Sequence, residues 1–264
     1  MLYINTNKLE KINFTKNNFY VVIDFDRTLT SNTSDGSWNV FENPKTFNEN
    51  FVKSAKKLTA KYYPYELDYN LDIKTKEKYI EEWYYKNINL LYDYNLTYDA
   101  FLNCMKNSNL KFRDGAKEFL SFLNSNNIPV IILSAGIGNV IEEFLKTNNC
   151  FFENIFVESN FIKFKDGKMQ QFTDKMILSL NKSTINLPDN IKNSLKEKEY
   201  ILLLGDLIDD ICMVSKNDLY RTLTIGFLEN KVEENMQFYN DNFDIVFTNN
   251  TSFEEVQKLI FKNY

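Results

Sequence analysis

The 264-residue sequence predicts an α/β fold, in which a parallel sheet flanked by helices carries an inserted helical cap. Four short apolar runs lack the alternation of a half-exposed strand, which indicates strands buried on both faces. Segments with helical periodicity separate these runs, an order typical of parallel sheets with right-handed crossovers. The interval between the first two runs is far longer than one crossover needs, so it predicts an insertion.

The expected strands are residues 19–26, 129–136, 154–161 and 200–206, with the sequences FYVVIDFD, PVIILSAG, NIFVESNF and YILLLGD. Helices are expected over residues 117–127 and 139–149, before and after the second strand. Residues 161–172, FIKFKDGKMQQF, predict a hairpin that turns at Asp166-Gly167.

The long interval is the expected cap. It is rich in aromatic side chains and helix-periodic, as in TKEKYIEEWYYKNINLLYDY. We therefore divide the chain into a core, residues 1–31 and 113–264, and a helical cap, residues 32–112. Ligands of open parallel sheets bind at the carboxyl ends of the strands. Three polar residues fall at such ends: Asp24, Ser134 and Asp206.

The charge and composition are typical of a cytoplasmic protein. A net charge of −5 disfavours a nucleic-acid partner. No apolar stretch has transmembrane length, and the N-terminus lacks the apolar core of a signal peptide. Cys104, Cys150 and Cys212 show no metal-binding spacing, and free thiols fit a reducing compartment. We expect a cytoplasmic monomer without nucleic-acid or membrane partners.

The chain contains no histidine, which restricts its chemistry. Ser-His-Asp and Cys-His hydrolases and histidine-rich zinc sites are excluded. A phosphatase of the Cys-x5-Arg type is also excluded, because the residues six positions after the cysteines are Leu110, Phe156 and Asp218. Any reaction must use carboxylates, lysine, hydroxyls or a metal ion.

Two aspartates, Asp24 and Asp26, follow the first apolar run. If the strand continued through them, both carboxylates would lie on one side, and repulsion would raise a pKa unless a cation lay between them. Mg²⁺ prefers such oxygen ligands, and Asp206 offers a third. Asp24 could then attack phosphorus while Asp26 protonates the leaving oxygen. Ser134, beside a turn expected at Gly136, could donate to phosphate.

These stretches resemble a known group of enzymes. DFDRT, LSAG, a following lysine and GDLIDD resemble the four motifs of the haloacid-dehalogenase superfamily, which has a Rossmann-like core. Asp26 favours a phosphatase over a dehalogenase, because release of an alkoxide requires a proton donor. From about residue 18 onward, KYYPYELDYNLDIKTKEKYIEEWYYKNINLL, SAGIGNVIEEFL, ESNFIKF and IGFLENKVEENMQFYNDNFDIVF resemble the cytosolic pyrimidine 5′-nucleotidase III family.

The resemblance implies roles for the acidic residues. By motif position, Asp24 is the nucleophile and Asp26 the acid/base. Mg²⁺ is the expected cofactor, held by Asp24, the backbone carbonyl of Asp26, and Asp206. Asp210 is expected to support the metal site, with Asp209 as the alternative.

The resemblance also implies where the substrate binds. Ser134, Ala135 and Lys182 are expected at the phosphate, with Lys175 as the alternative to Lys182. Four residues are expected at the nucleoside: Glu66, Trp83, Trp38 and Asn87. Asn87 stands where the family often has serine, and Trp38 where some relatives carry histidine, so both differences concern recognition of the base.

The predicted function is Mg²⁺-dependent hydrolysis of nucleoside 5′-monophosphates through an aspartyl-phosphate, with UMP and CMP preferred. A preference for 7-methylguanosine monophosphate is an alternative, because a cationic base beside Glu66 and a tryptophan would be favourable. The same core could also serve a phosphoserine or sugar phosphatase, and a phospho-aspartate would permit phosphotransfer to a nucleoside. Outside the enzymes, the competing interpretation is a core that only binds its ligand.

Overall fold

The computed structural model describes residues 2–182 and 187–261. Its largest sheet has the strand order β1-β9-β8-β7-β2-β3-β4, and every neighbouring pair is parallel except β1 with β9. The strands are β1 (Leu2–Ile4), β2 (Phe19–Ile23), β3 (Val130–Ile137), β4 (Ile155–Asn160), β7 (Tyr200–Gly205), β8 (Thr222–Leu228) and β9 (Ile245–Thr248). This arrangement confirms the predicted α/β class.

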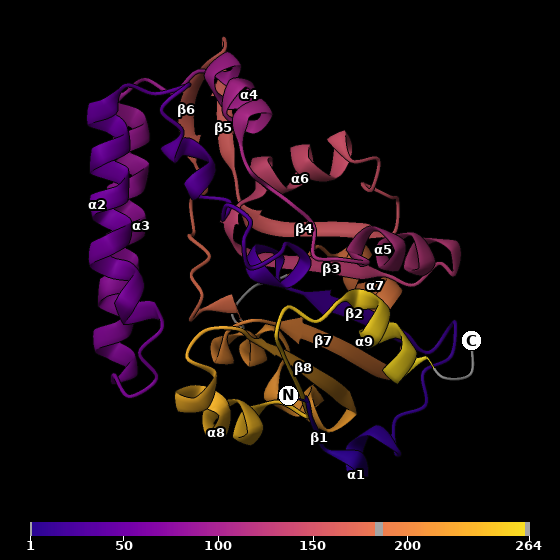
Figure 1. Cartoon of the computed structure of the whole chain (residues 1–264). Helices are drawn as coiled ribbons and strands as arrows, with labels where there is room; N and C mark the ends of the chain where they lie inside the picture. The colour runs from indigo at the N-terminus through magenta and orange to yellow at the C-terminus, as the bar shows by residue number, and fades with distance from the viewer. Residues whose placement is uncertain (1, 183–186, 262–264) are drawn as a thin grey trace.

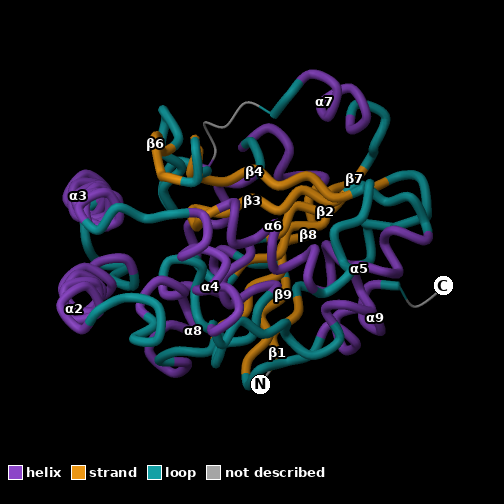
Figure 2. Tube along the Cα trace, turned by 90° about the horizontal axis from the view of Figure 1, so that it is seen from above, coloured by secondary structure: helices purple, strands orange, loops and turns teal. Residues whose placement is uncertain are grey.

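Helices cover both faces of this sheet (Figures 1 and 2). Apolar side chains of α5, α6 and α9 pack with one set of alternating strand residues, which includes Val21 and Ile23. Side chains of α7 and α8 pack with the opposite set, which includes Tyr20 and Val22. Burial of both faces explains why the strands are apolar without alternation. The bounds are α1 (Thr6–Leu9), α5 (Ala116–Ser125), α6 (Gly138–Thr147), α7 (Asp189–Leu195), α8 (Val232–Asn242) and α9 (Phe253–Ile260).

Residues of the expected cap form a separate group of helices, of which α2 and α3 stand side by side away from the sheet (Figure 1). The elements are η2 (Asn39–Glu42), α2 (Glu49–Glu66), α3 (Ile73–Asp93) and α4 (Tyr98–Asn107). Each of α2, α3 and α4 is preceded by an N-cap residue: Asn48, Asp72 and Thr97. The side chain of each accepts a hydrogen bond from the backbone N–H three residues farther along.

The predicted hairpin is present as β5 (Ile162–Lys165) and β6 (Lys168–Phe172). Asp166 and Gly167 form its turn, both with positive φ. Apolar side chains of both strands, among them Ile162 and Phe172, pack with cap residues such as Phe101. The hairpin therefore extends the apolar interior of the cap, whereas the division at residues 31 and 113 stays a prediction.

The expectation that strand pleating aligns Asp24 with Asp26 is wrong. Strand β2 ends at Ile23, and Phe25–Leu29 form a helical turn, η1. Inside this turn Asp26 is extended and Arg27 has a φ of 60°, so the backbone reverses instead of running on. The turn expected at Gly136 is also absent, because β3 continues to Ile137 with a shift of its register against β4. Among the described residues, no helix has the length and apolar character needed to cross a membrane.

Candidate active site

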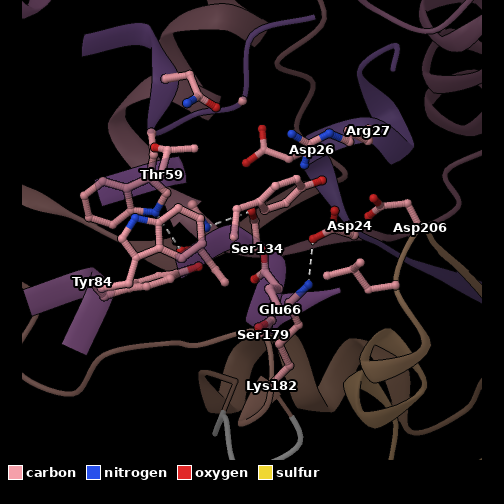
Figure 3. Close-up of a pocket in the computed structure, with 18 residues that line it drawn as sticks. Asp24, Asp26, Arg27, Thr59, Glu66, Tyr84, Ser134, Ser179, Lys182 and Asp206 are labelled. Carbon is pink, nitrogen blue, oxygen red and sulfur yellow. Dashed lines mark hydrogen bonds and ion pairs between the residues drawn. The ribbon is translucent and has the colours of Figure 1, made fainter. Parts of the chain in front are cut away.

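A cavity lies at the carboxyl ends of β2, β3 and β7, and residues of α2 and α3 also line it, among them Glu66 and Tyr84 (Figure 3). Nine predicted site residues line it: Asp24, Asp26, Trp38, Glu66, Trp83, Ser134, Ala135, Lys182 and Asp206. Residues far apart in the sequence thus meet at the edge of the sheet where the strand order predicted a ligand.

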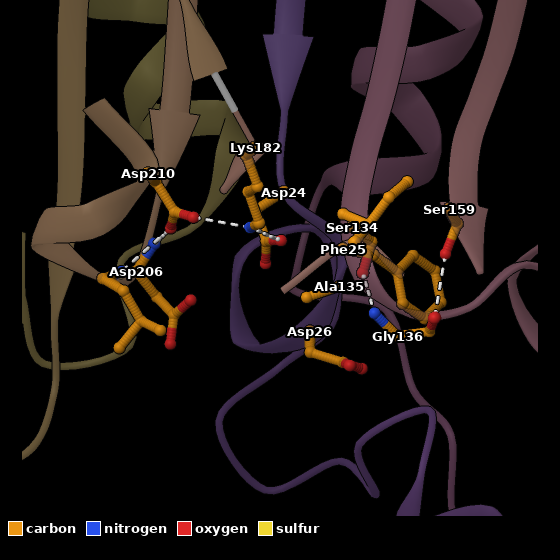
Figure 4. A network of polar contacts seen from close by, with 12 residues as sticks. Asp24, Phe25, Asp26, Ser134, Ala135, Gly136, Ser159, Lys182, Asp206 and Asp210 are labelled. Atoms are coloured by element: carbon orange, nitrogen blue, oxygen red, sulfur yellow. Dashed lines mark hydrogen bonds and ion pairs between the residues drawn. The ribbon is translucent and has the colours of Figure 1, made fainter. Parts of the chain in front are cut away.

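A buried ion network connects two aspartates through a lysine (Figure 4). Lys182 Nζ donates to Asp24 Oδ1 at 2.7 Å and to Asp210 Oδ1 at 2.6 Å. Burial raises the pKa of Asp24 to about 7; Lys182 opposes this rise and Asp210 adds to it. Burial alone would lower the pKa of Lys182, but the two carboxylates raise it, so the ammonium persists. Lys175, the alternative, is exposed.

Three carboxylates form a compact acidic cluster beside this lysine. Single oxygens of Asp24, Asp206 and Asp210 all lie within 4.8 Å of one another. Burial raises the pKa of Asp206 well above its usual range, and the charges of Asp24 and Asp210 add to the effect. Asp24 and Asp210 are buried and Asp206 is half-buried, so three carboxylates face one ammonium and the nearby Arg27 guanidinium. Such hard oxygen donors fit a divalent cation such as Mg²⁺.

Asp210 and Asp209 point to different partners. Asp210 Oδ2 accepts the backbone N–H groups of Asp206 and Leu207, both at 3.0 Å. With Oδ1 on Lys182, both oxygens of Asp210 hold neighbouring parts of the site. Asp209 instead forms an ion pair with Lys76. This geometry favours Asp210 over Asp209 as the supporting residue.

Ser37 orients the carboxyl group of Asp26. Its backbone N–H donates to Asp26 Oδ1 at 2.8 Å, and its hydroxyl donates to Oδ2 at 2.6 Å. Burial raises the pKa of Asp26, and the two bonds from Ser37 counteract part of that rise. A half-buried carboxyl group that is oriented by two hydrogen bonds and lines the cavity suits proton transfer.

The end of β3 brings backbone and hydroxyl groups to the cavity. The Gly136 N–H donates to Ser134 Oγ at 3.1 Å, and a Cβ at Gly136 would lie 2.0 Å from Ser37 Oγ. Only glycine allows that close approach. Asn160 donates to the carbonyls of Ala135 and Ile177 and thereby ties β3 to the segment that leads to Lys182.

The wall opposite the carboxylates combines a buried acid with aromatic rings. Glu66 is 8% exposed, and burial raises its pKa. Trp38 donates its indole N–H to the Ala135 carbonyl at 3.3 Å and meets Tyr84 edge-on at 5.2 Å. Within the described residues the indole N–H of Trp83 has no hydrogen-bond partner. A flat ligand with polar edges would find ring surfaces, one acceptor and one donor here.

One predicted residue lies elsewhere, and several lining residues were not predicted. Asn87 borders a smaller neighbouring cavity, which Trp38 and Thr59 also line. The additional residues of the main cavity include Arg27, Tyr63, Tyr84 and Ser179. Arg27 stands within the DFDRT motif and Tyr63 close to Glu66, so proximity in sequence was the available signal. Ser37 directly precedes Trp38, but nothing in the sequence indicated its contact with Asp26, because a loop brings the two together.

A family model described as pyrimidine 5′-nucleotidase (UMPH-1) matches residues 25–263. The chain belongs to the pyrimidine 5′-nucleotidase family. This family member is 34% identical over 248 residues to the human 7-methylguanosine phosphate-specific 5′-nucleotidase, across 91% of the chain and 83% of the relative. Identity to the Drosophila melanogaster enzyme of the same description is 31% over 249 residues, across 91% of the chain and 78% of that relative.

Solved structures agree with this membership. The structure of cytosolic 5′-nucleotidase IIIB bound to cytidine aligns with a TM-score of 0.80 and 27% identity, across 97% of this chain and 88% of that one. A substrate-bound phosphoserine phosphatase aligns with a TM-score of 0.61 and 18% identity, across 94% of this chain and 100% of that one. This likeness shows the shared fold. The family member is thus a 5′-nucleotidase, a hydrolase, on the haloacid-dehalogenase core, as predicted.

Proposed function

We propose that this chain hydrolyses nucleoside 5′-monophosphates with Mg²⁺, that Asp24 is the nucleophile, and that it acts as a cytosolic monomer. One observation carries the chemistry: the Lys182 ammonium joins Asp24 and Asp210 beside Asp206, in a cavity whose opposite wall is Glu66 and aromatic rings. A Caenorhabditis elegans relative, 28% identical, is named a putative cytosolic 5′-nucleotidase and supports that location.

The residues divide the reaction into two displacements. In the first, an Asp24 oxygen bonds to phosphorus, the bond from phosphorus to the nucleoside 5′ oxygen breaks, and Asp26 protonates that oxygen. In the second, Asp26 takes a proton from water as the water oxygen attacks phosphorus, and the bond to Asp24 breaks. Lys182, Ser134 and Ala135 line the same cavity, and in this proposal the lysine, the hydroxyl and the backbone at Ala135 hold the phosphoryl oxygens.

Mg²⁺ held by Asp24, Asp206 and the Asp26 carbonyl would neutralise charge on the phosphoryl group and on the carboxylates. Asp210 would not need to bind the ion, because its oxygens already hold Lys182 and the Asp206–Leu207 backbone.

Pyrimidine nucleotides are the proposed preferred substrates, and the cytidine bound to the similar structure supports a pyrimidine in this cavity. A second candidate is 7-methylguanosine monophosphate. The buried Glu66 carboxylate near Trp38 and Tyr84 suits a cationic base, which both the charge and the ring faces would attract.

A substrate panel tests the proposal. Phosphate release with Mg²⁺ is measured from UMP, CMP, 7-methylguanosine monophosphate, AMP, phosphoserine and glucose 6-phosphate. We expect the nucleotides to give a higher kcat/KM than phosphoserine and the sugar phosphate, with UMP and CMP foremost. Equal or better turnover of phosphoserine or the sugar phosphate would contradict a nucleoside site at Glu66, and a clear lead of the methylated nucleotide would select the second candidate.

Replacing the buried acid, Glu66→Gln, should separate recognition from chemistry. Loss of a charged hydrogen bond costs about 1.5–3 kcal/mol, so kcat/KM for the preferred nucleotide should fall by about 10-fold to 100-fold. Turnover of p-nitrophenyl phosphate, which lacks a nucleoside, should change little. Glu81→Gln, on the exposed side of α3, is the matched control.

The same variant should gain stability in neutral solution. Burial raises the pKa of Glu66 in the folded state above its unfolded value, so ionisation favours unfolding as pH rises between the two. Thermal unfolding of the metal-free protein at pH 4 and pH 7 measures this, and the advantage of Glu66→Gln should be larger at pH 7. An equal effect at both pH values would mean that Glu66 carries no raised pKa.

A further inference from the structure

The peptide unit between Asp206 and Leu207 is held from both of its polar ends. Its N–H, which belongs to Leu207, donates to Asp210 Oδ2 at 3.0 Å. Its carbonyl, which belongs to Asp206, accepts a hydrogen bond from the hydroxyl of Tyr239 on α8. The Tyr239 side chain that makes this bond is 3% exposed. The backbone that carries the Asp206 carboxylate is therefore fixed by two side chains.

The cap supplies a further bond to this unit. The hydroxyl of Tyr69, in the loop between α2 and α3, lies 3.1 Å from the hydroxyl of Tyr239. A tyrosine hydroxyl has one proton, and that of Tyr239 is directed to the Asp206 carbonyl, so Tyr69 must be the donor. Burial raises the pKa of both tyrosines, so both hydroxyls remain protonated. The bonds run in one direction, from cap to core.

An ion pair makes a second connection between the cap and the core. Lys76, on the first turns of α3, is 3% exposed and lies 2.7 Å from Asp209. Its ammonium also lies 5.2 Å from the centre of the Tyr69 ring. Lys76 therefore packs against the tyrosine while it binds the helical turn Ile208–Met213, which begins two residues after Asp206. Two contacts of different chemistry thus connect this part of the cap to the acidic cluster.

We propose that Tyr239 is a positioning residue for Asp206, and that Tyr69 and Lys76 extend this support from the cap. The inference rests on the Mg²⁺ site of the proposed function. Glu66 ends α2 only three residues before Tyr69. The segment that faces the nucleoside therefore also supports the backbone at Asp206. When the segment from Glu66 to Lys76 contacts the core, it orders both the residues that face the nucleoside and the backbone of Asp206.

Magnesium affinity distinguishes positioning from a merely structural role. Mg²⁺ is titrated calorimetrically into wild type, Tyr239→Phe, Tyr69→Phe and the double variant, without nucleotide. Tyr239→Phe should bind Mg²⁺ about threefold to tenfold more weakly, the usual consequence of one lost hydrogen bond. Tyr69→Phe should act in the same direction. The factor by which the double variant loses Mg²⁺ affinity should be smaller than the product of the two single factors, because both bonds involve the Tyr239 hydroxyl.

Tyr92→Phe is the matched control. Its hydroxyl donates to the Gln170 carbonyl at 3.2 Å, which is also a bond from a cap helix to a backbone carbonyl, but it lies at the hairpin. This variant should bind Mg²⁺ like wild type. Thermal unfolding of all variants in EDTA shows that they are folded, and the rise in unfolding temperature on adding Mg²⁺ should be smallest in the double variant.

Asp206→Asn separates failure of this inference from failure of the metal site. If Asp206→Asn binds Mg²⁺ like wild type, Asp206 is not a ligand and both proposals fall. If Asp206→Asn loses binding but Tyr239→Phe keeps wild-type affinity, only the positioning role is overturned. If Tyr92→Phe weakens binding as much as Tyr239→Phe, the effect is general and the inference is also overturned.

Discussion

Asp24→Asn is expected to lower phosphate release from the preferred nucleotide by about 10⁴-fold or more, as removal of a nucleophile does. The amide cannot form the bond to phosphorus that the carboxylate forms. The site should otherwise persist, because Lys182 keeps its bond to Asp210 and the backbone of Asp24 still donates to the Leu204 carbonyl. The measurement is single-turnover phosphate release at saturating Mg²⁺.

The control for this variant is Asp35→Asn, a change of the same type whose carboxylate accepts the backbone N–H of Asn109 outside the cavity. It should retain wild-type turnover. Denatured wild-type enzyme, quenched during turnover of a nucleotide labelled in its phosphate, should carry acid-stable label that Asp24→Asn lacks. Label retained on Asp24→Asn would assign the nucleophile to another residue.

Asp26→Ala should produce the second largest loss, and its size should depend on the leaving group. General acid–base catalysis contributes about 10²-fold to 10⁴-fold, so turnover of a nucleotide should fall by that factor. An alkoxide leaves only when protonated, whereas p-nitrophenolate is stable without a proton. The first step with p-nitrophenyl phosphate should therefore be much less affected, which a pre-steady-state burst of p-nitrophenol would reveal.

Ser37→Ala tests the orientation of the same carboxyl group. It removes the hydroxyl bond to Asp26 Oδ2 but keeps the backbone bond to Oδ1. The loss of turnover should therefore be smaller than that of Asp26→Ala and should depend on the leaving group in the same way. Equal losses on both esters for Asp26→Ala would show that Asp26 does not act as the acid for the leaving group.

The sequence predicted strands β2, β3, β4 and β7, because each contains a continuous apolar run. Strand β8 was missed because Thr222 and Thr224 interrupt its apolar pattern. Both are buried, and Asp244 satisfies the hydroxyl and the N–H of Thr224. Because the partner of the buried threonine lies 20 residues away in the sequence, local hydrophobicity cannot show that the polar side chain is satisfied. Strands β1 and β9 are too short to give a clear pattern.

The order of motifs predicted which charged residues meet, but not how they meet. The turn at Arg27 directs Asp26 to Ser37, and no periodicity could predict this. Asn87 shares a face of α3 with Trp83, one turn farther along, and this shift puts it beside the neighbouring cavity. Positions on a helix face are readable from sequence, whereas the cavity that each turn reaches depends on tertiary packing.

The strand order has a consequence for the newly made chain. Strand β2, which leads directly into Asp24, is paired at Val21 with Val130 on one side and with Leu202 on the opposite side. Because these partners are made much later, a ribosome-bound chain must carry an unpaired apolar strand through synthesis of the whole cap. Hydrolysis can begin only after β7 has joined the sheet. Products truncated before β7 should therefore be inactive and prone to aggregation.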